Sequence, residues 1–367
     1  MGPRAIVVSL LLLACTSAPA LDAGQTDAGE PDAAEHDAGP TVFDPVALAV
    51  YSEFLTYPEV EATLTALGTR DAALAVAVPN DRIGDAGLAS LLRAAEAAGV
   101  EVHLWFLLPL EDGYWPNEEN IDVFASEVMR LLDWIAAEGL VAAAVVYDLE
   151  PAFEYSEVLR AGLASGTFDE VEALMRTHMD EASYLAARDT LAAHVRAVQA
   201  RGLRANAVTY PQVLDDLGDG DHDLQDALDI PVEGVPFDSV SFMVYQTTFA
   251  EAGTGWIGPG LIRSYAADAN RHFGERATIA LGLVGNAGIF DHTGAIYDEP
   301  ASLAEDIAAA RAEGVNRVEV YSLDGMVELG LETWLTGTDA APARASIPSA
   351  ALIARGAAFS LDENLDE

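Results

Sequence analysis

Short apolar runs alternate with longer amphipathic stretches through most of this chain, and this alternation constrains its fold more than any other feature. Most of the runs are apolar almost throughout, as parallel strands buried on both faces are. We interpret each run as one strand of a single parallel sheet. The runs number eight and cover residues 46–54, 72–79, 100–109, 141–150, 203–210, 239–247, 278–284 and 317–323.

Helical patterns fill the stretches between the runs, and most of them end in Gly shortly before the next run, as helix C-termini often do. These patterns cover residues 57–68, 85–99, 120–139, 181–202, 260–274 and 301–314. Strand and helix repeated eight times over predict a (β/α)8 TIM barrel. A doubly wound open sheet is the alternative, but no Gly-rich phosphate loop follows the first run.

The charge of the chain is strongly acidic. Its 367 residues include 60 Asp and Glu against 18 Lys and Arg, and all 18 of these cations are Arg. Because the resulting net charge of −42 repels phosphate backbones, we expect no nucleic-acid partner. The absence of Lys excludes Schiff-base aldolase chemistry and the phosphate-binding P-loop, since both need a Lys side chain.

Motifs for metal and acyl-transfer chemistry are missing from the sequence. The seven His residues are scattered, with no His-x-His or His-Glu-x-x-His spacing. No Gly-x-Ser-x-Gly nucleophile elbow occurs either. We therefore expect neither a metal nor another cofactor.

The N-terminus has the features of an export signal. Arg4 precedes an apolar run at residues 6–14 that is too short to span a bilayer. The run ends Leu-Leu-Ala-Cys15, which resembles the lipobox of bacterial lipoproteins, and Cys15 is the only Cys in the chain. The resemblance implies that Cys15 becomes the lipid-modified first residue of a protein anchored to the cell envelope by acyl chains alone. A plain secretory signal, cleaved near Ala18 or Ala20, is the alternative.

Four segments follow from these patterns: a signal peptide, a tether, the barrel and a tail. Residues 1–15 form the signal peptide, and residues 16–41 are small, acidic and low in complexity, as disordered tethers are. We assign residues 42–340 to the barrel and residues 341–367 to a tail with one short helical piece. We expect the protein to be a monomer.

Two insertions interrupt the strand-to-helix pattern, at residues 153–177 and 211–236. Both follow the C-terminal end of an expected strand, which is the side on which barrel enzymes bind substrate. The second insertion contains an acidic run at residues 215–223 that lacks the spaced terminal Glu of an EF-hand. We therefore expect an acidic surface loop there rather than a cation site.

Polar and aromatic residues stand where the expected strands end, and in a barrel these ends converge on one mouth. Aromatic rings together with amides and carboxylates suit a carbohydrate ligand, whose C–H faces stack on rings while its hydroxyls form hydrogen bonds. The candidates are Ser52, Glu53, Asn80, Asp81, Trp105, Glu111, Asp148, Glu150, Tyr210, Gln212, Tyr245, Gln246, Asn286, Tyr321, Ser322 and Asp324.

Two of these candidates, Asp148 and Glu150, lie one residue apart at the end of the fourth run. Side chains alternate across a strand, so both carboxyl groups should point the same way. Burial and a neighbouring carboxylate both disfavour ionisation of Glu150, as an acid catalyst requires. The alternative is a structural pair bound to Arg or to loop amides.

The segment Tyr147-Asp-Leu-Glu150 resembles the end of the Asp-x-x-Asp-x-Asp-x-Glu motif of glycoside hydrolase family 18, the chitinase-like barrels. Met243-Val-Tyr-Gln246, on the sixth run, resembles that family's Met-x-Tyr-Asp motif. The resemblance implies that Glu150 protonates the leaving glycosidic oxygen and that Asp148 holds the substrate N-acetyl group. The acetyl carbonyl would attack the anomeric carbon, with Tyr245 donating a hydrogen bond to it.

The ends of the expected strands supply a set of substrate-binding candidates around these three catalytic residues. We assign this role to Trp105, Tyr210, Gln212, Gln246, Asn286, Tyr321, Asp324, Glu53 and Asn80. The sequence departs from the family at Ala143 and Val146, where the motif has acids, and at Gln246 and Tyr321.

Two alternatives therefore stay open beside a hydrolase of N-acetylhexosamine glycans. One is a glycan-binding surface protein without catalysis. The other is a hydrolase of another barrel family, with Asp148 or Glu150 as nucleophile. Its partner acid would be one of Glu53, Asp81, Glu111 and Asp324.

Overall fold

The computed structural model describes residues 45–365, except residue 166 and the segments 247–255 and 286–296. Cys15, the expected signal peptide, the expected tether and Asn286 lie outside the described residues. Among the described residues, no helix has the length and apolar character needed to cross a membrane.

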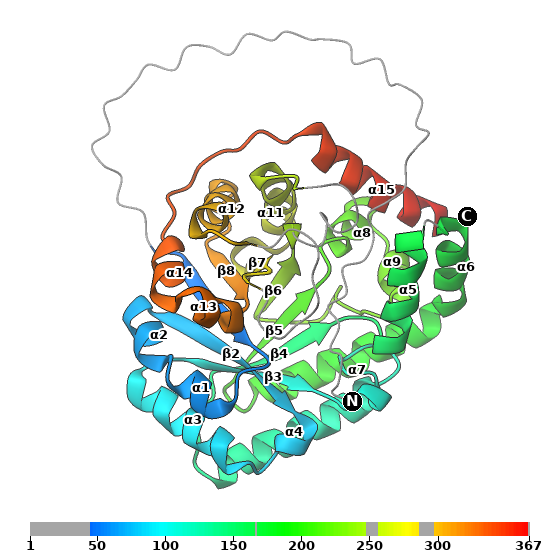
Figure 1. Ribbon diagram of the computed structural model, residues 1–367. Coiled ribbons are helices and arrows are strands. Elements are labelled where there is room, and N and C mark those ends of the chain that lie inside the picture. Colours follow the sequence, from blue (N-terminus) through cyan, green and yellow to red (C-terminus); the bar gives the residue numbers. More distant parts are fainter. Residues whose placement is uncertain (1–44, 166, 247–255, 286–296, 366–367) are drawn as a thin grey trace.

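Eight parallel strands close into a barrel in chain order, and helices enclose it, so the predicted (β/α)8 TIM barrel is confirmed (Figure 1). Each strand falls within or close to one of the eight apolar runs. The strands are β1 (Ala47–Ser52), β2 (Ala72–Pro79), β3 (Val102–Leu107), β4 (Ala144–Leu149), β5 (Arg204–Thr209), β6 (Ser239–Met243), β7 (Ala277–Gly282) and β8 (Arg317–Tyr321).

Helices follow the strands, and one of the expected helical patterns divides into two helices. The pattern at residues 57–68 breaks at Thr63, whose hydroxyl donates to the carbonyl oxygen of Val60 (2.7 Å) and competes with helical hydrogen bonding. The helices are α1 (Tyr57–Glu61), α2 (Leu64–Arg70), α3 (Ala86–Ala98), α4 (Ile121–Ala137), α5 (Phe153–Ser165), α6 (Phe168–His178), α7 (Glu181–Gln199), α8 (Val213–Asp219), α9 (Asp223–Ala227), α11 (Pro259–Phe273), α12 (Pro300–Ala312), α13 (Leu323–Leu329), α14 (Leu331–Gly337) and α15 (Ser349–Leu365).

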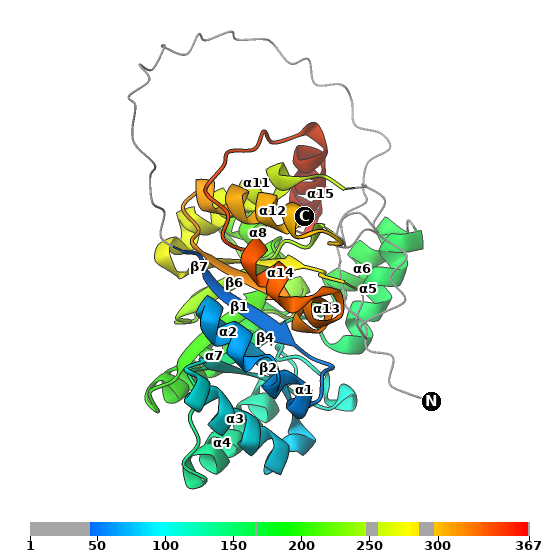
Figure 2. The same cartoon turned by 60° about the vertical axis from the view of Figure 1, so that its left-hand side comes forward.

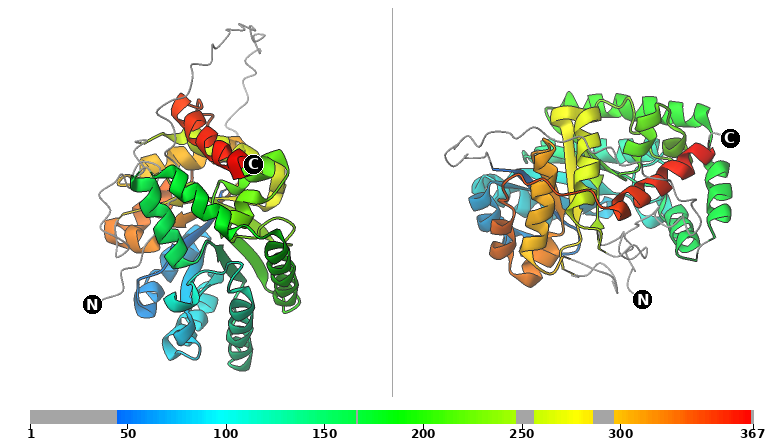
Figure 3. Two further views of the ribbon diagram at one scale, coloured as in Figure 1. Left: turned by 90° about the vertical axis from the view of Figure 1, so that its right-hand side faces the viewer. Right: turned by 90° about the horizontal axis from the view of Figure 1, so that it is seen from above.

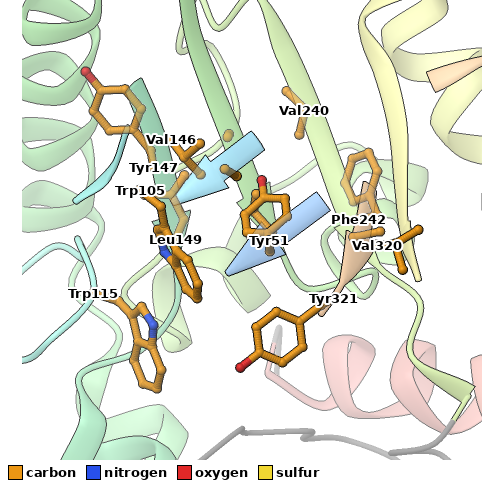
Figure 4. Close-up of a cluster of buried hydrophobic side chains, with 14 of the residues drawn as sticks. Tyr51, Trp105, Trp115, Val146, Tyr147, Leu149, Val240, Phe242, Val320 and Tyr321 are labelled. Carbon is orange, nitrogen blue, oxygen red and sulfur yellow. The ribbon is translucent and has the colours of Figure 1, made fainter. Parts of the chain in front are cut away.

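Alternate side chains of each strand point into the barrel or out toward the helices. On β4, Tyr147 points outward and packs against Phe124 of α4 and His194 of α7, with ring centroids 5.7 Å away in both cases. Figure 4 shows Tyr51 and Trp105 on the inner side of the strands, away from the ring of Tyr147. The same alternation places Asp148, next to Tyr147, inside the barrel.

Both expected insertions carry helices. The first holds α5 and α6, which lie side by side (Figure 2). The second holds α8 and α9, and its acidic run differs from our expectation of a surface loop. Asp215 and Asp216 are buried, and both carboxylates have partners within the protein. Arg355 donates to Asp215 (Nε to Oδ1, 2.9 Å), and the Leu224 amide donates to Asp216 (2.9 Å). No group of metal-ligating side chains occurs among the described residues.

The segment that we expected as a tail carries α15, which is longer than the short helical piece predicted. It packs against α8, α9 and α11, and it is drawn in red in Figure 3. Arg355 fixes it there, because this side chain bonds to Asp215 and lies 4.4 Å from the ring centroid of Tyr265 on α11. The helix therefore belongs to the packed outer layer of the barrel.

Candidate functional site

Three carboxylic acids lie at the C-terminal end of the barrel: Glu53 just after β1, Asp148 within β4 and Glu150 just after β4. Asp148 and Glu150 are each only 5% exposed, and Glu53 is partly buried. None of the ion pairs formed among the described residues involves any of the three. Their hydrogen-bond donors are neutral side chains, so the alternative of a structural pair bound to Arg finds no support.

Glu150 accepts a hydrogen bond from the hydroxyl of Tyr210 (2.7 Å), which follows β5. Burial raises the pKa of Glu150 well above its usual range, and the nearby charges of Asp148 and Glu53 add to this effect. The hydrogen bond from Tyr210 opposes it but does not cancel it. Burial and the neighbouring charges therefore favour the protonated form of Glu150, which is the form that an acid catalyst needs.

Asp148 accepts a hydrogen bond from the indole Nε1 of Trp105 on β3 (3.1 Å, to Oδ2). Its other oxygen, Oδ1, is buried and has no hydrogen-bond partner among the described residues. Burial raises the pKa of Asp148 to about 8, with a further contribution from the charge of Glu53. A buried acceptor without a partner has a free-energy cost, and a ligand with an N–H group would remove that cost.

Glu53 accepts hydrogen bonds from two phenols, Tyr321 of β8 (2.5 Å) and Tyr114 of the loop after β3 (2.9 Å). Burial raises the pKa of Glu53 to about 7, although both phenols act to lower it. Asp324 fixes the backbone of the segment that carries Glu53. Its carboxylate accepts from the backbone amides of Glu53 (3.3 Å), Phe54 (2.9 Å) and Leu55 (2.8 Å).

Aromatic rings line the space around the acids. Tyr245 stacks on Tyr321, with centroids 6.3 Å apart and ring planes 17° apart, and Trp105 meets Tyr321 edge to face at 6.2 Å. Burial and then the charges of Asp148 and Glu150 raise the pKa of Tyr245. Gly282 of β7 leaves room for the Tyr245 ring, because an added Cβ would lie 3.1 Å from one of its carbons.

The structure thus brings seven of the predicted site residues together. They are Glu53, Trp105, Asp148, Glu150, Tyr210, Tyr245 and Tyr321. Three phenols, one indole and three carboxyl groups form this acid cluster. It can supply protons, accept hydrogen bonds from a ligand and stack against the C–H face of a sugar ring.

Other predicted residues have their side chains engaged elsewhere. The Asp324 carboxylate is occupied by backbone amides, as described above. Gln246 is fully buried and donates to Asp306 of α12 (2.8 Å to Oδ1). Asn80, on a short 3-10 turn after β2, accepts a hydrogen bond from Arg130 of α4 near the outer surface. Gln212 is buried at the start of α8, two residues after Tyr210.

The remaining mouth candidates also differ in position. Asp81 is exposed, with 82% of its side chain accessible, and Glu111 is exposed as well. Ser322 accepts from the amide of Gly325 (3.2 Å) and caps α13. Neither Asp81 nor Glu111 reaches the acid cluster through a hydrogen bond among the described residues.

Sequence reasoning missed three residues of this region: Tyr51, Tyr114 and Glu319. Tyr51 lies two residues before Glu53 and Glu319 two residues before Tyr321, so alternation along the strands was the signal that could have found both. Tyr114 lies in a loop with a positive φ of 68°, and no periodic pattern marks it.

No family model matches the chain, and no curated protein matches it in sequence. Solved structures resemble its fold. The C-terminal domain of a protein assigned as a chitinase in Desulfitobacterium hafniense DCB-2 shares 11% identity, with 81% of this chain and 99% of that chain covered and a TM-score of 0.48. A glycoside hydrolase family 17 β-1,3-glucanosyltransferase from Rhizomucor miehei shares 14% identity, with 78% and 90% covered and a TM-score of 0.45.

Other chemistries occur on similar barrels. D-allulose 3-epimerase from Methylomonas sp. shares 11% identity, with 88% of this chain and 98% of that chain covered and a TM-score of 0.43. Structures that resemble this chain thus include glycoside hydrolases and sugar epimerases. At these identities the likeness concerns the fold, and function has to be argued from the site itself.

Proposed function

We propose that this protein is a glycoside hydrolase that cleaves an N-acetylhexosamine-containing glycan with the help of the substrate's own acetamido group. The observation that carries the proposal is Glu150, a carboxyl group buried at the end of β4 beside Asp148, with the hydroxyl of Tyr210 rather than a cation as its described partner. An acid that keeps its proton near neutral pH can deliver it to a glycosidic oxygen.

In this mechanism Glu150 gives its proton to the leaving oxygen as the glycosidic bond breaks. Asp148 accepts the acetamido N–H through Oδ1, which is buried and without a partner among the described residues. The acetamido carbonyl oxygen attacks the anomeric carbon, and water later opens the resulting ring while giving a proton to the Glu150 carboxylate. Tyr245, stacked on Tyr321, donates a hydrogen bond to that oxygen.

The test replaces Glu150 by Gln, which keeps the shape and removes the proton. Chromogenic β-linked N-acetylglucosamine oligomers serve as substrates. We expect Glu150→Gln to lower kcat by a factor of about 10² to 10⁴, the usual contribution of a general acid. The matched control is Glu154→Gln, at an exposed position of α5, which should behave as the unchanged protein does. If Glu150→Gln hydrolyses these oligomers at the unchanged rate, the proposal is wrong.

A second candidate function is glycan binding without turnover. Val146 favours it, because this residue is fully buried in β4 at a position where the family resemblance implies an acid. Calorimetric binding of the same oligomers, together with no product after long incubation of the unchanged protein, would select this candidate. A hydrolase that uses two carboxylates directly would instead cleave glycans that lack the acetamido group.

We also propose that the protein is exported and held at the bacterial cell envelope through lipid on Cys15. The support is the Leu-Leu-Ala-Cys15 segment and the single occurrence of Cys. Cys15→Ser should move the protein from the membrane fraction to the soluble fraction and abolish labelling by a radioactive fatty acid. Membrane association and labelling that survive this change would contradict the proposal.

A further inference from the structure

A fourth buried acid, Glu319 of β8, lies inside the barrel, and the mechanism above does not use it. Its exposed fraction is 5%, and it accepts a hydrogen bond from the hydroxyl of Tyr51 on β1 (3.0 Å). Burial raises the pKa of Glu319 to about 7, while Ser241 of β6 and Tyr51 act to lower it. Arg317, on the same strand, lowers it less.

A cavity of about 840 Å³ opens at the opposite, N-terminal end of the barrel and reaches Glu319. The first residues of several strands line it, among them Ala47, Ala72, Arg204 and Arg317. The cavity therefore lies on the N-terminal side of Glu319, and Tyr51 binds Glu319 inside the barrel. Glu319 is thus in contact with a cavity that lies at the end of the barrel away from the mouth.

Contacts inside the barrel link Glu319 to the acid cluster. The Tyr51 ring that binds Glu319 meets Trp105 edge to face, with centroids 5.4 Å apart. Trp105 in turn donates to Asp148. A negative charge on Glu319 disfavours a negative charge on Asp148, and this is one of the causes that raise the pKa of Asp148. No cation lies between the two acids in these contacts.

We propose that Glu319 is a positioning residue for the hydrolysis: its charge decides how firmly Asp148 keeps its proton. Only the expected effect of Glu319 on catalysis rests on the proposed function. The inward position two residues before Asp148 on β4 is Val146, which is not an acid. Glu319 supplies an interior acid from β8 instead. Ionised Glu319 disfavours ionisation of Asp148 and thereby limits the negative charge that raises the pKa of Glu150.

Several other groups face these two acids and must be held constant in a pH experiment. Toward Glu319 they are Tyr51, Arg317 and, around the cavity, His103 and Arg204. Toward Asp148 they are Glu53, Glu150, Trp105, Tyr114, Tyr210 and Tyr245. The variants below leave all of these side chains in place, except where Tyr51 itself is changed.

The test compares Glu319→Gln with the unchanged protein. The first readout is the infrared carbonyl stretch of protonated carboxyl groups across pH, with the Asp148 band assigned by its loss in Asp148→Asn. Removing the charge of Glu319 should lower the pH at which Asp148 titrates by about half a unit to one unit. The second readout is kcat against pH: its alkaline limb should move up while KM stays unchanged, because an ionised Asp148 raises the pKa of Glu150.

Two further variants guard against a purely structural effect. Glu101→Gln, at the exposed rim of the same cavity, is the matched control and should leave both readouts unchanged. Glu319→Asp retains the charge and should restore the Asp148 titration toward that of the unchanged protein. If Glu319→Gln does not fold, Tyr51→Phe replaces it; loss of the donor should move Glu319 to a higher pH and Asp148 to a lower one.

The outcomes separate the two proposals. An infrared shift without hydrolysis of any glycan supports the link between Glu319 and Asp148 and contradicts the proposed function. Hydrolysis that requires Glu150, with an Asp148 titration that Glu319→Gln does not move, contradicts the role of Glu319. A shift that Glu101→Gln produces equally would also contradict it, because the effect would then be a general one of charge.

Discussion

Asp148 and Asp215 are two buried aspartates in one barrel, with exposed fractions of 5% and 6%. Burial raises the pKa of Asp215 to about 6, whereas it raises the pKa of Asp148 to about 8. The difference lies in their partners. Arg355 binds Asp215, but Asp148 meets only the neutral indole of Trp105 and other acids.

The comparison shows how similar acids acquire different roles. A buried carboxylate that is paired with Arg stays charged at neutral pH and connects two segments, here α8 and α15. A buried carboxyl group that is met by neutral donors can hold or release a proton near neutral pH. The ion pair of Asp215 and Arg355 therefore holds two helices together, whereas the acid cluster can hold and release protons.

The largest effect on stability is expected when the ion pair of Asp215 and Arg355 is removed. Arg355→Met leaves Asp215 buried without its cation and should lower the free energy of unfolding by about 3 to 5 kcal/mol. Denaturant unfolding at pH 7.5 measures it. The matched control is Arg271→Met, which removes an exposed partner of Asp268 and should change stability by about 1 kcal/mol or less. Equal effects of both substitutions would mean that burial does not distinguish the two ion pairs.

A pH dependence of stability is also expected from the acid cluster, at higher pH than from Asp215. The folded state binds protons at Asp148 and Glu53 up to a higher pH than the unfolded chain, whose carboxyl groups titrate near pH 4. Their stabilising contribution is thus complete below about pH 4 and is lost as pH rises through about 7 to 8. Asp148→Asn removes one titrating group and should flatten this decline by up to about 1.4 kcal/mol per pH unit.

Denaturant unfolding at a series of pH values between 4 and 9 tests this expectation. Asp133→Asn, an exposed residue of α4, is the control and should leave the slope unchanged. If Asp148→Asn keeps the full slope, the acid cluster does not determine the pH dependence of stability.

The barrel could be predicted because its strands are almost purely apolar and alternate regularly with helices. Positions inside the barrel followed from alternation alone for Asp148 and Glu150. Long-range partners did not follow. Asp324 binds backbone amides near residue 54, some 270 positions away in sequence, and Gln246 binds Asp306. A polar residue at a strand end looks the same in the sequence whether it faces a ligand or the protein's own backbone.

The local shape of the chain after each strand was equally hidden. The sixth apolar run continues to residue 247, but β6 ends at Met243 because the backbone then turns tightly, with the Tyr245 amide donating to the Met243 carbonyl (2.9 Å). Tyr114, which binds Glu53 through its hydroxyl, has a positive φ. Such turns depend on packing that no periodic pattern encodes.

The smallest expected effect concerns the two phenol hydroxyls that donate hydrogen bonds to Glu53. Tyr321→Phe keeps the ring stacked near Tyr245 and removes only the hydroxyl that donates to Glu53. The loss should cost about 1 kcal/mol of stability, and more at pH 9 than at pH 5, because a hydrogen bond to an ionised carboxylate is the stronger one. It should also raise the pKa of Glu53 further above 7, since this donor holds that pKa down.

Tyr114→Phe is the matched comparison, because its hydroxyl donates to the other oxygen of Glu53 from a less buried position. Its effect should have the same sign and a smaller size. Unfolding of both variants at pH 5 and pH 9 measures the difference. A loss of equal size at the two pH values would show that Glu53 does not ionise in this range. Neutral phenols would then be its permanent partners, and only Asp148 and Glu150 would remain to exchange protons at the mouth.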